Sequence, residues 1–193
     1  MKVKLDERSA LIIVDVQRDF CPGGALAVPY GDEIIPVLNR YIEKFEETGA
    51  PIFATRDWHP KNHISFKSEG GQWPEHCVQN SEGAEFHPAL NLPANVKVIS
   101  KGTDPDREAY SGFEGTSLEE ELRSLGISKL FVGGLATDYC VKHTVLDAVE
   151  RGFEVYLLED AIRGVDLQKG DSERAITEMV NKGVKKVRIT DIE

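Results

Sequence analysis

Three residues suited to nucleophilic chemistry stand at the ends of short apolar runs. Asp15 follows Leu-Ile-Ile-Val, Lys101 follows Val-Lys-Val-Ile-Ser, and Cys140 follows Gly-Gly-Leu-Ala-Thr-Asp-Tyr. A cysteine at the start of a helix and near an ammonium group has a lowered pKa and attacks carbonyl carbons. A neighbouring carboxylate takes the thiol proton and passes it to the leaving group. We therefore predict Cys140 as nucleophile, Asp15 as proton carrier and Lys101 as their cationic neighbour. Backbone N–H groups of the turn from Ala136 to Cys140 would form an oxyanion hole.

Each of these residues also has an ordinary structural interpretation. A cysteine is often a small apolar side chain packed under a sheet, and an aspartate and a lysine often form a plain ion pair. The chain has three cysteines, too few for a disulfide scaffold, and the odd number leaves at least one free thiol. We expect Cys21 and Cys77 to be packing residues.

A second group of residues is typical of a metal site. Asp57 and His59 are separated by one residue, so on an extended segment their side chains point the same way. With His76 they make a two-imidazole, one-carboxylate set that suits a divalent metal with open positions. Zinc, iron and manganese all accept such ligands. Loop histidines are also common as plain surface residues, and His63 is open as a ligand, a supporting donor or a gate.

Three aromatic residues lie in the predicted loops near these groups. Phe20, Trp73 and Tyr110 are candidates for stacking on a flat aromatic substrate, although core packing is the default for any one of them. The sequence contains no phosphate-binding loop, dinucleotide fingerprint or Gly-x-Ser-x-Gly elbow.

Short apolar runs alternate with helical patterns along the chain, which predicts a parallel sheet with helices on both faces. The predicted strands span residues 9–16, 51–55, 96–100, 129–133, 154–158 and 184–189. The predicted helices span residues 32–48, 116–125, 139–151 and 172–181. We expect Asp32 to cap the first helix. We expect a capping box to open the second helix, with Leu125 facing inward. We expect a three-layer α/β fold with strand order 3-2-1-4-5-6. In that order the carboxyl ends of strands one and four flank a ligand-binding crevice, and Asp15 faces Cys140 across it. Residues 57–95 form a long loop of little periodicity, typical of a functional segment.

Length and charge exclude several classes of protein. The chain has 193 residues, 23 Lys plus Arg and 33 Asp plus Glu, for a formal charge of −10. Nucleic-acid and anionic-membrane binding need a basic face, so we expect neither. We expect one domain spanning residues 1–193. The first apolar run is too short for a signal peptide or a membrane span, which suggests a cytoplasmic protein.

Several motifs resemble known enzymes. The first strand and the segment around Cys140 resemble the isochorismatase-like cysteine hydrolases. The motifs of the long loop and of the segment after Lys101 look like those of the nicotinamidases within that family. These motifs are residues 11–20, 134–141, 55–60, 63–66, 73–78, 83–87 and 110–113.

The resemblance implies hydrolysis of nicotinamide, and of pyrazinamide, to the acid and ammonia, the entry step of NAD salvage. It implies the same roles for the Cys–Asp–Lys set, and a metal whose open position takes the pyridine nitrogen. It also implies a cis peptide bond between Leu135 and Ala136. Related proteins use either the equivalent of His63 or a water network near Ser65 at the metal, so ligand number stays open. They often form homo-oligomers. Two alternatives remain: an amidohydrolase for a carbamoyl or ureido substrate, and a metal-bound scaffold that only binds ligands.

Overall fold

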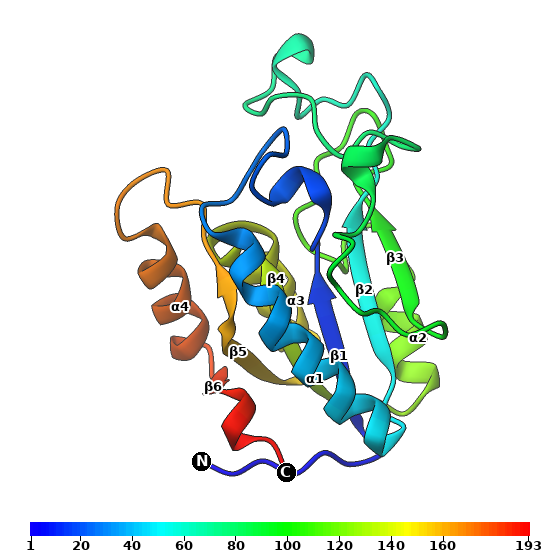
Figure 1. Cartoon of the computed structure of the whole chain (residues 1–193), viewed down its shortest axis with the longest axis vertical. Coiled ribbons are helices and arrows are strands. Elements are labelled where there is room, and N and C mark those ends of the chain that lie inside the picture. The colour runs from blue at the N-terminus through cyan, green and yellow to red at the C-terminus, as the bar shows by residue number, and fades with distance from the viewer.

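The computed structural model describes all 193 residues and contains one six-stranded parallel sheet. Its order, β3-β2-β1-β4-β5-β6, is the predicted one (Figure 1). The strands are β1 Ser9–Val14, β2 Ile52–Asp57, β3 Lys97–Lys101, β4 Lys129–Leu135, β5 Glu154–Arg163 and β6 Lys185–Val187. The helices are α1 Ile35–Thr48, α2 Leu118–Ser124, α3 Lys142–Glu150 and α4 Asp171–Asn181, with a π-helical turn at Thr137–Val141 before α3.

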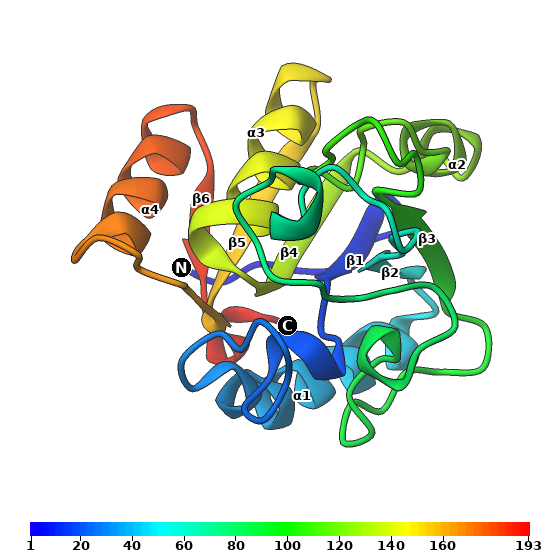
Figure 2. The same cartoon turned by 90° about the horizontal axis from the view of Figure 1, so that it is seen from above.

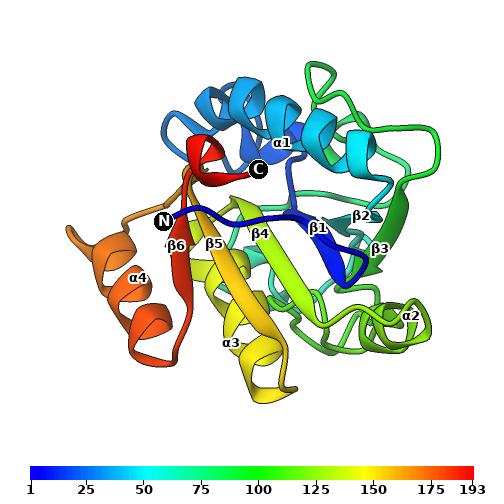
Figure 3. The same cartoon turned by 90° about the horizontal axis from the view of Figure 1, so that it is seen from below.

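Helices cover both faces of the sheet. Helix α1 lies on one face, and α2, α3 and α4 lie on the other (Figures 2 and 3). Because β-α-β crossovers are right-handed, a connection toward β2 and one toward β5 place their helices on opposite faces. The direction of the sheet therefore reverses between β1 and β4, and a ligand-binding crevice is expected above that point.

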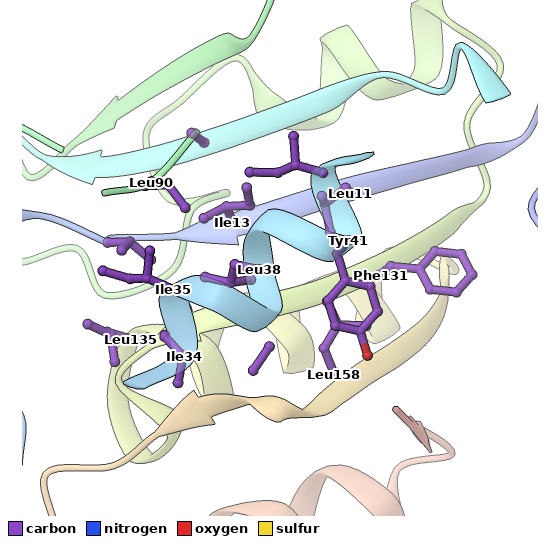
Figure 4. Close-up of a cluster of buried hydrophobic side chains, with 14 of the residues drawn as sticks. Leu11, Ile13, Ile34, Ile35, Leu38, Tyr41, Leu90, Phe131, Leu135 and Leu158 are labelled. Carbon is purple, nitrogen blue, oxygen red and sulfur yellow. The ribbon is translucent and has the colours of Figure 1, made fainter. Parts of the chain in front are cut away.

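Strand β1 is buried on both faces, which explains its unbroken apolar sequence. Leu11 and Ile13 point toward α1 (Figure 4). Ala10, Ile12 and Val14 belong to the opposite cluster, with side chains of α2 and α3. The strand that ends at the crevice is thus anchored from both sides.

Tyr41 is the one polar side chain in the buried face of α1. Its ring is fully buried against the sheet, and its hydroxyl donates a hydrogen bond of 2.8 Å to Asp160 Oδ1 (Figure 4). Because the hydroxyl has this partner, the helix buries the whole ring without an unpaired polar group.

Two predicted helix starts are wrong. Asp32 does not cap α1, because Gly31–Ile34 form a 3-10 turn and α1 begins only at Ile35. The predicted capping box between Thr116 and Glu119 does not form either, since the Thr116 hydroxyl accepts from the Leu118 N–H at 3.3 Å and Glu119 pairs with Arg151 at 3.0 Å. In both places a contact or turn outside the local motif replaces the expected cap.

Leu125 also differs from the prediction that it faces inward, because 45% of the side chain is exposed. Helix α2 ends at Ser124, one residue earlier than predicted, so Leu125 is its C-cap. A C-cap lies beyond the last regular turn and need not share the buried face of the helix.

Strand β4 passes very close to β1 where it approaches the crevice. Gly134 has φ +124°, and a Cβ atom there would lie 2.1 Å from the carbonyl oxygen of Val14. Glycine is therefore required at this position, and it lets β4 run on to Leu135, further than the predicted end. The turn that carries Cys140 follows directly.

The long loop between β2 and β3 lies above the carboxyl ends of the strands (Figure 1). Its only helical pieces are two 3-10 turns, Lys67–Glu69 and Glu82–Ala84, which agrees with the predicted loop. No helix has both the length and the apolar character needed to span a bilayer.

Candidate active site

Four strands deliver the predicted catalytic and metal-binding residues to one edge of the sheet. Asp57 and Lys101 are the last residues of β2 and β3, Asp15 follows β1, and Cys140 lies in the turn after β4. All four are buried. The predicted meeting of these residues at the crevice is confirmed.

Lys101 is the centre of this group. Its Nζ lies 2.8 Å from Asp15 Oδ2 and 3.4 Å from Cys140 Sγ, and it also pairs with Asp57 Oδ1. Burial alone would lower the pKa of Lys101, but the two carboxylates outweigh it and raise the pKa well above its usual value. The ammonium group therefore stays charged and holds the three partners together.

Asp15 is fixed in an unusual backbone conformation, with φ +51°. Its Oδ1 accepts a hydrogen bond of 2.7 Å from the Thr55 hydroxyl, and its N–H donates to the Thr55 carbonyl at 3.1 Å. Its Oδ2 pairs with Lys101 but accepts no well-directed hydrogen bond, and one oxygen of this carboxylate lies within 4.8 Å of Cys140 Sγ. Burial raises the pKa of Asp15, while Lys101 opposes that rise. This carboxylate is arranged to accept a proton from the thiol.

Cys140 differs from the prediction in one respect. It lies in the π-helical turn Thr137–Val141, and burial together with the Asp15 carboxylate raises its pKa well above the usual value, although Lys101 opposes this. The expectation of a lowered pKa is therefore wrong. Because the thiol is protonated at neutral pH, it needs a base to become a nucleophile, and Asp15 is in place to be that base.

Ala136, predicted for the oxyanion hole together with Cys140, is the N-cap of the same turn. The Leu135–Ala136 peptide bond is cis, as the resemblance implied. Both residues line the pocket in front of Cys140.

Asp57, His59 and His76 form a compact donor set. Asp57 Oδ2 is 3.3 Å from His59 Nε2 and 3.7 Å from His76 Nε2, and all three side chains are buried. Ligands about 2.1 Å from a tetrahedral metal ion stand about 3.4 Å apart, so these spacings suit one small divalent cation.

The outer nitrogen of each histidine has a backbone partner. His59 Nδ1 lies 2.8 Å from the Gly102 carbonyl oxygen, and His76 Nδ1 lies 2.7 Å from that of Pro74. A carbonyl oxygen only accepts, so each Nδ1 carries the proton and each Nε2 offers its lone pair to the donor set. Burial acts to raise the pKa of Asp57, but Lys101 and the two histidines outweigh it and hold the pKa well below its usual range. The residues fit a divalent metal.

Three supporting residues were not identified from the sequence. Gln17 donates to the carbonyl of the metal-binding Asp57 and accepts from its N–H, both at 2.8 Å. Asp19 accepts from the N–H of Cys77, next to His76, at 2.8 Å. Thr55 holds Asp15 as described. The available signal was strand parity for two of them, because Thr55 lies two residues before Asp57 and Gln17 two residues after Asp15. Asp19 lies in the 3-10 turn Arg18–Phe20 and gave no such signal.

An apolar pocket lies between the metal-binding loop and Cys140. Its lining is mostly hydrophobic, with a few polar groups from the metal-binding residues, as is usual for small-molecule sites. Phe20, Trp73 and Tyr110 line it, so the predicted aromatic residues converge on the site. Trp73 Nε1 donates to the Tyr110 hydroxyl at 3.1 Å, which fixes the two rings together. Cys21 and Cys77 are buried in the core facing α1, as predicted.

Comparisons with known proteins agree with this geometry. The isochorismatase domain family matches residues 9–191. The nicotinamidase of Escherichia coli (strain K12) is 45% identical over 205 residues, covering 95% of this chain and 96% of that protein. The crystal structure of the pyrazinamidase of Pyrococcus horikoshii in complex with zinc superposes with a TM-score of 0.90 at 58% identity, covering 94% of this chain and 99% of that one. A structure from L. infantum in complex with nicotinate has a TM-score of 0.92 at 35% identity and covers 100% of this chain and 99% of its own.

Proposed function

This chain belongs to the isochorismatase domain family, and we propose from that premise that it is a nicotinamidase. It hydrolyses the carboxamide of nicotinamide to nicotinate and ammonia. The observation that carries the proposal is that a Cys–Asp–Lys group and a two-histidine, one-carboxylate donor set meet at one apolar pocket, joined by the Lys101–Asp57 ion pair.

The first half of the reaction forms a thioester. Asp15 takes the proton from Cys140 Sγ, and the thiolate attacks the carboxamide carbon to give a tetrahedral oxyanion. N–H groups of the turn from Ala136 to Cys140 stabilise this oxyanion. Asp15 then gives its proton to the departing nitrogen, ammonia leaves, and the acyl group stays on sulfur. Lys101 stabilises each anionic form of its two partners.

The second half releases the acid. Asp15 takes a proton from water, the resulting hydroxide attacks the thioester carbon, and the carbon–sulfur bond breaks. The proton on Asp15 returns to Cys140, so the enzyme regains its starting state. Because the pKa of Asp15 is raised by burial, the carboxyl group exchanges protons with the thiol and with water more readily than an exposed aspartate would.

Asp57, His59 and His76 hold the divalent metal in this proposal. When bound, the metal offers an open coordination position to the pyridine nitrogen and so orients the ring. Phe20 and Trp73 contact the faces and edges of that ring, which leaves the carboxamide directed at Cys140. The zinc complex of the Pyrococcus horikoshii relative supports zinc as the metal.

The proposal extends to further properties of the chain. We expect pyrazinamide to be a second substrate, because it also carries a ring nitrogen and a carboxamide. Residues 1–193 form one hydrolase domain, the protein assembles as a homo-oligomer, and it acts in NAD salvage in the cytoplasm.

The decisive experiment measures ammonia release from nicotinamide by the wild-type protein and by Cys140→Ala. We expect turnover by the wild type and none by the variant, with nicotinamide binding retained because the metal and the aromatic residues remain. Ammonia release by Cys140→Ala at the wild-type rate would exclude the thioester mechanism.

Two further measurements separate the alternatives. An aldehyde analogue of nicotinamide should form a covalent adduct on Cys140, visible by intact mass, whereas a scaffold that only binds ligands forms none. Removal of the metal with a chelator should abolish nicotinamide turnover and metal addition should restore it. Full activity on a carbamoyl substrate without metal would favour the other amidohydrolase class.

A further inference from the structure

His63 is fully buried in the metal-binding loop, yet both of its ring nitrogens have partners outside the donor set. Nδ1 lies 2.7 Å from Ser65 Oγ and 3.2 Å from the Ser65 backbone nitrogen. Nε2 lies 2.9 Å from the carbonyl oxygen of Arg107. The ring stacks on His59, with centroids 4.0 Å apart.

These partners fix the tautomer of His63. The Ser65 N–H only donates, so Nδ1 accepts, and the Arg107 carbonyl only accepts, so Nε2 carries the hydrogen. A ring in this state has its one lone pair directed at Ser65 and none available for a metal.

We propose that His63 is a positioning residue that ties residues 107–110, the wall segment, to the metal-binding loop and thereby shapes the substrate pocket. The proposal rests on the proposed function for its kinetic consequence only. In structural terms, the Nε2–H of His63 donates a hydrogen bond to the Arg107 carbonyl. His63 therefore has no free lone pair with which to bind a metal.

The wall segment contributes directly to the pocket. Glu108, Ala109 and Tyr110 line it together with the metal-binding residues. The Ala109 carbonyl also lies 3.4 Å from Lys101 Nζ. A displacement of the segment would therefore widen the pocket and remove one partner of the central ammonium group.

Few hydrogen bonds hold the wall segment in place, although the Tyr110 ring at its end also packs on Tyr139 and His143. It belongs to a stretch without helix or strand between β3 and α2. Besides the His63 bond, the metal-binding loop reaches this stretch through the Ile64 N–H, which donates to the Pro105 carbonyl at 2.8 Å. Trp73 holds the far end through Tyr110. Because the ties are few, loss of the His63 donor should measurably loosen the segment.

The test compares two variants of the metal-loaded protein. His63→Phe keeps a flat ring for stacking on His59 but removes both ring nitrogens. His63→Gln places an amide N–H close to the position of Nε2 and so keeps a donor for Arg107. The readouts are metal content per chain, hydrogen exchange of the amides in residues 103–110, and kcat and KM for nicotinamide.

For His63→Phe we expect full metal content, about fivefold faster exchange in residues 103–110 and a KM about fivefold higher, which corresponds to one lost neutral hydrogen bond. We expect kcat to fall by less than about twofold, since Lys101 keeps both carboxylate partners even where the Ala109 carbonyl moves away. His63→Gln should recover most of both losses. Loss of metal from both variants, or unchanged exchange in His63→Phe, would overturn the proposal.

A measurement on the unmodified protein covers the case in which His63→Phe does not fold. Nitrogen NMR of the histidine rings in the metal-loaded wild type should show one imidazole with a protonated Nε2 and no metal bond, in addition to His59 and His76. If that ring instead shows a metal-bound nitrogen, His63 is a ligand. Neither the spectrum nor the exchange data depend on nicotinamide turnover, so the positioning role and the proposed function fail or hold separately.

Discussion

Replacement of Gln17 by methionine tests how strongly one buried amide supports the metal-binding edge of the sheet. Gln17 is fully buried; its Nε2 donates to the carbonyls of Asp57 at 2.8 Å and Ala84 at 2.9 Å, and its Oε1 accepts from the Asp57 N–H at 2.8 Å. Strand β1 pairs with β2 only as far as Thr55. Beyond that point the side chain of Gln17 supplies hydrogen bonds that a longer strand would have made.

The size of the effect follows from the number of bonds lost. Methionine has nearly the same shape as glutamine but neither donates nor accepts strongly. Each lost hydrogen bond costs about 1 kcal/mol net, so three cost about 3 kcal/mol of the free energy of unfolding. The backbone groups of Asp57 and Ala84 that remain buried without a hydrogen-bond partner would increase this loss of stability.

The assay is urea unfolding with chelator present, so that altered metal binding does not add to the difference. Gln79→Met is the matched control, because Gln79 makes a single side-chain hydrogen bond, to the Trp58 carbonyl at 3.0 Å, and should lose only about 1 kcal/mol. A loss for Gln17→Met no larger than that of the control would refute the reasoning.

Two other predictions follow from single contacts. Gly102→Ala should lower the metal content of the protein and reduce the free energy of unfolding by about 1–3 kcal/mol. The reason is that Gly102 has φ +63° and a Cβ atom there would lie 2.5 Å from the ring of His59. A metal assay and a melting curve would test this, and full metal content would contradict it. Asp6→Asn should destabilise the protein at neutral pH, because the bond from Lys129 at 2.7 Å holds the pKa of Asp6 well below its usual value. A lowered carboxyl pKa gives stability that is present above about pH 4 and is lost as pH falls. The difference in free energy of unfolding between variant and wild type should therefore shrink when unfolding is measured in acid. A difference that stays constant with pH would exclude this cause.

The fold was predictable because its signals are repeated along the chain. The central strands are short apolar runs bounded by turn residues, and their alternation with helices predicts a parallel sheet. The helix starts were less predictable. The Glu119 carboxylate pairs with Arg151, which lies 32 residues further along the chain. A capping motif predicted from four neighbouring residues cannot include such a distant partner.

The site was predictable in its membership but not in its electrostatics. Asp15, Lys101 and Cys140 stand at strand ends, and strand order brings strand ends together. The pKa of Cys140, however, depends on the balance between burial, Asp15 and Lys101, all of which are set by tertiary packing. The local argument from the helix start named the right residue and gave the wrong direction for its pKa.

The supporting residues show the same limit. Gln17 and Thr55 act through hydrogen bonds to segments about 40 residues away. Nothing in their immediate sequence distinguishes them from other buried polar residues. Strand parity places them on a useful face, but only the paired strands show which backbone or carboxylate group they reach.

One ammonium group, that of Lys101, contacts both the nucleophile's base and a metal-binding carboxylate. Any cation that Asp57 binds competes with Lys101 for that carboxylate and strengthens its hold on Asp15 and Cys140. The two centres are therefore thermodynamically linked, and linkage is reciprocal. The factor by which a reversible thiol ligand changes metal affinity must equal the factor by which metal changes the equilibrium affinity of that same ligand. Through Lys101, ligand binding at the thiol thus changes the metal affinity, and metal binding changes the ligand affinity of the thiol.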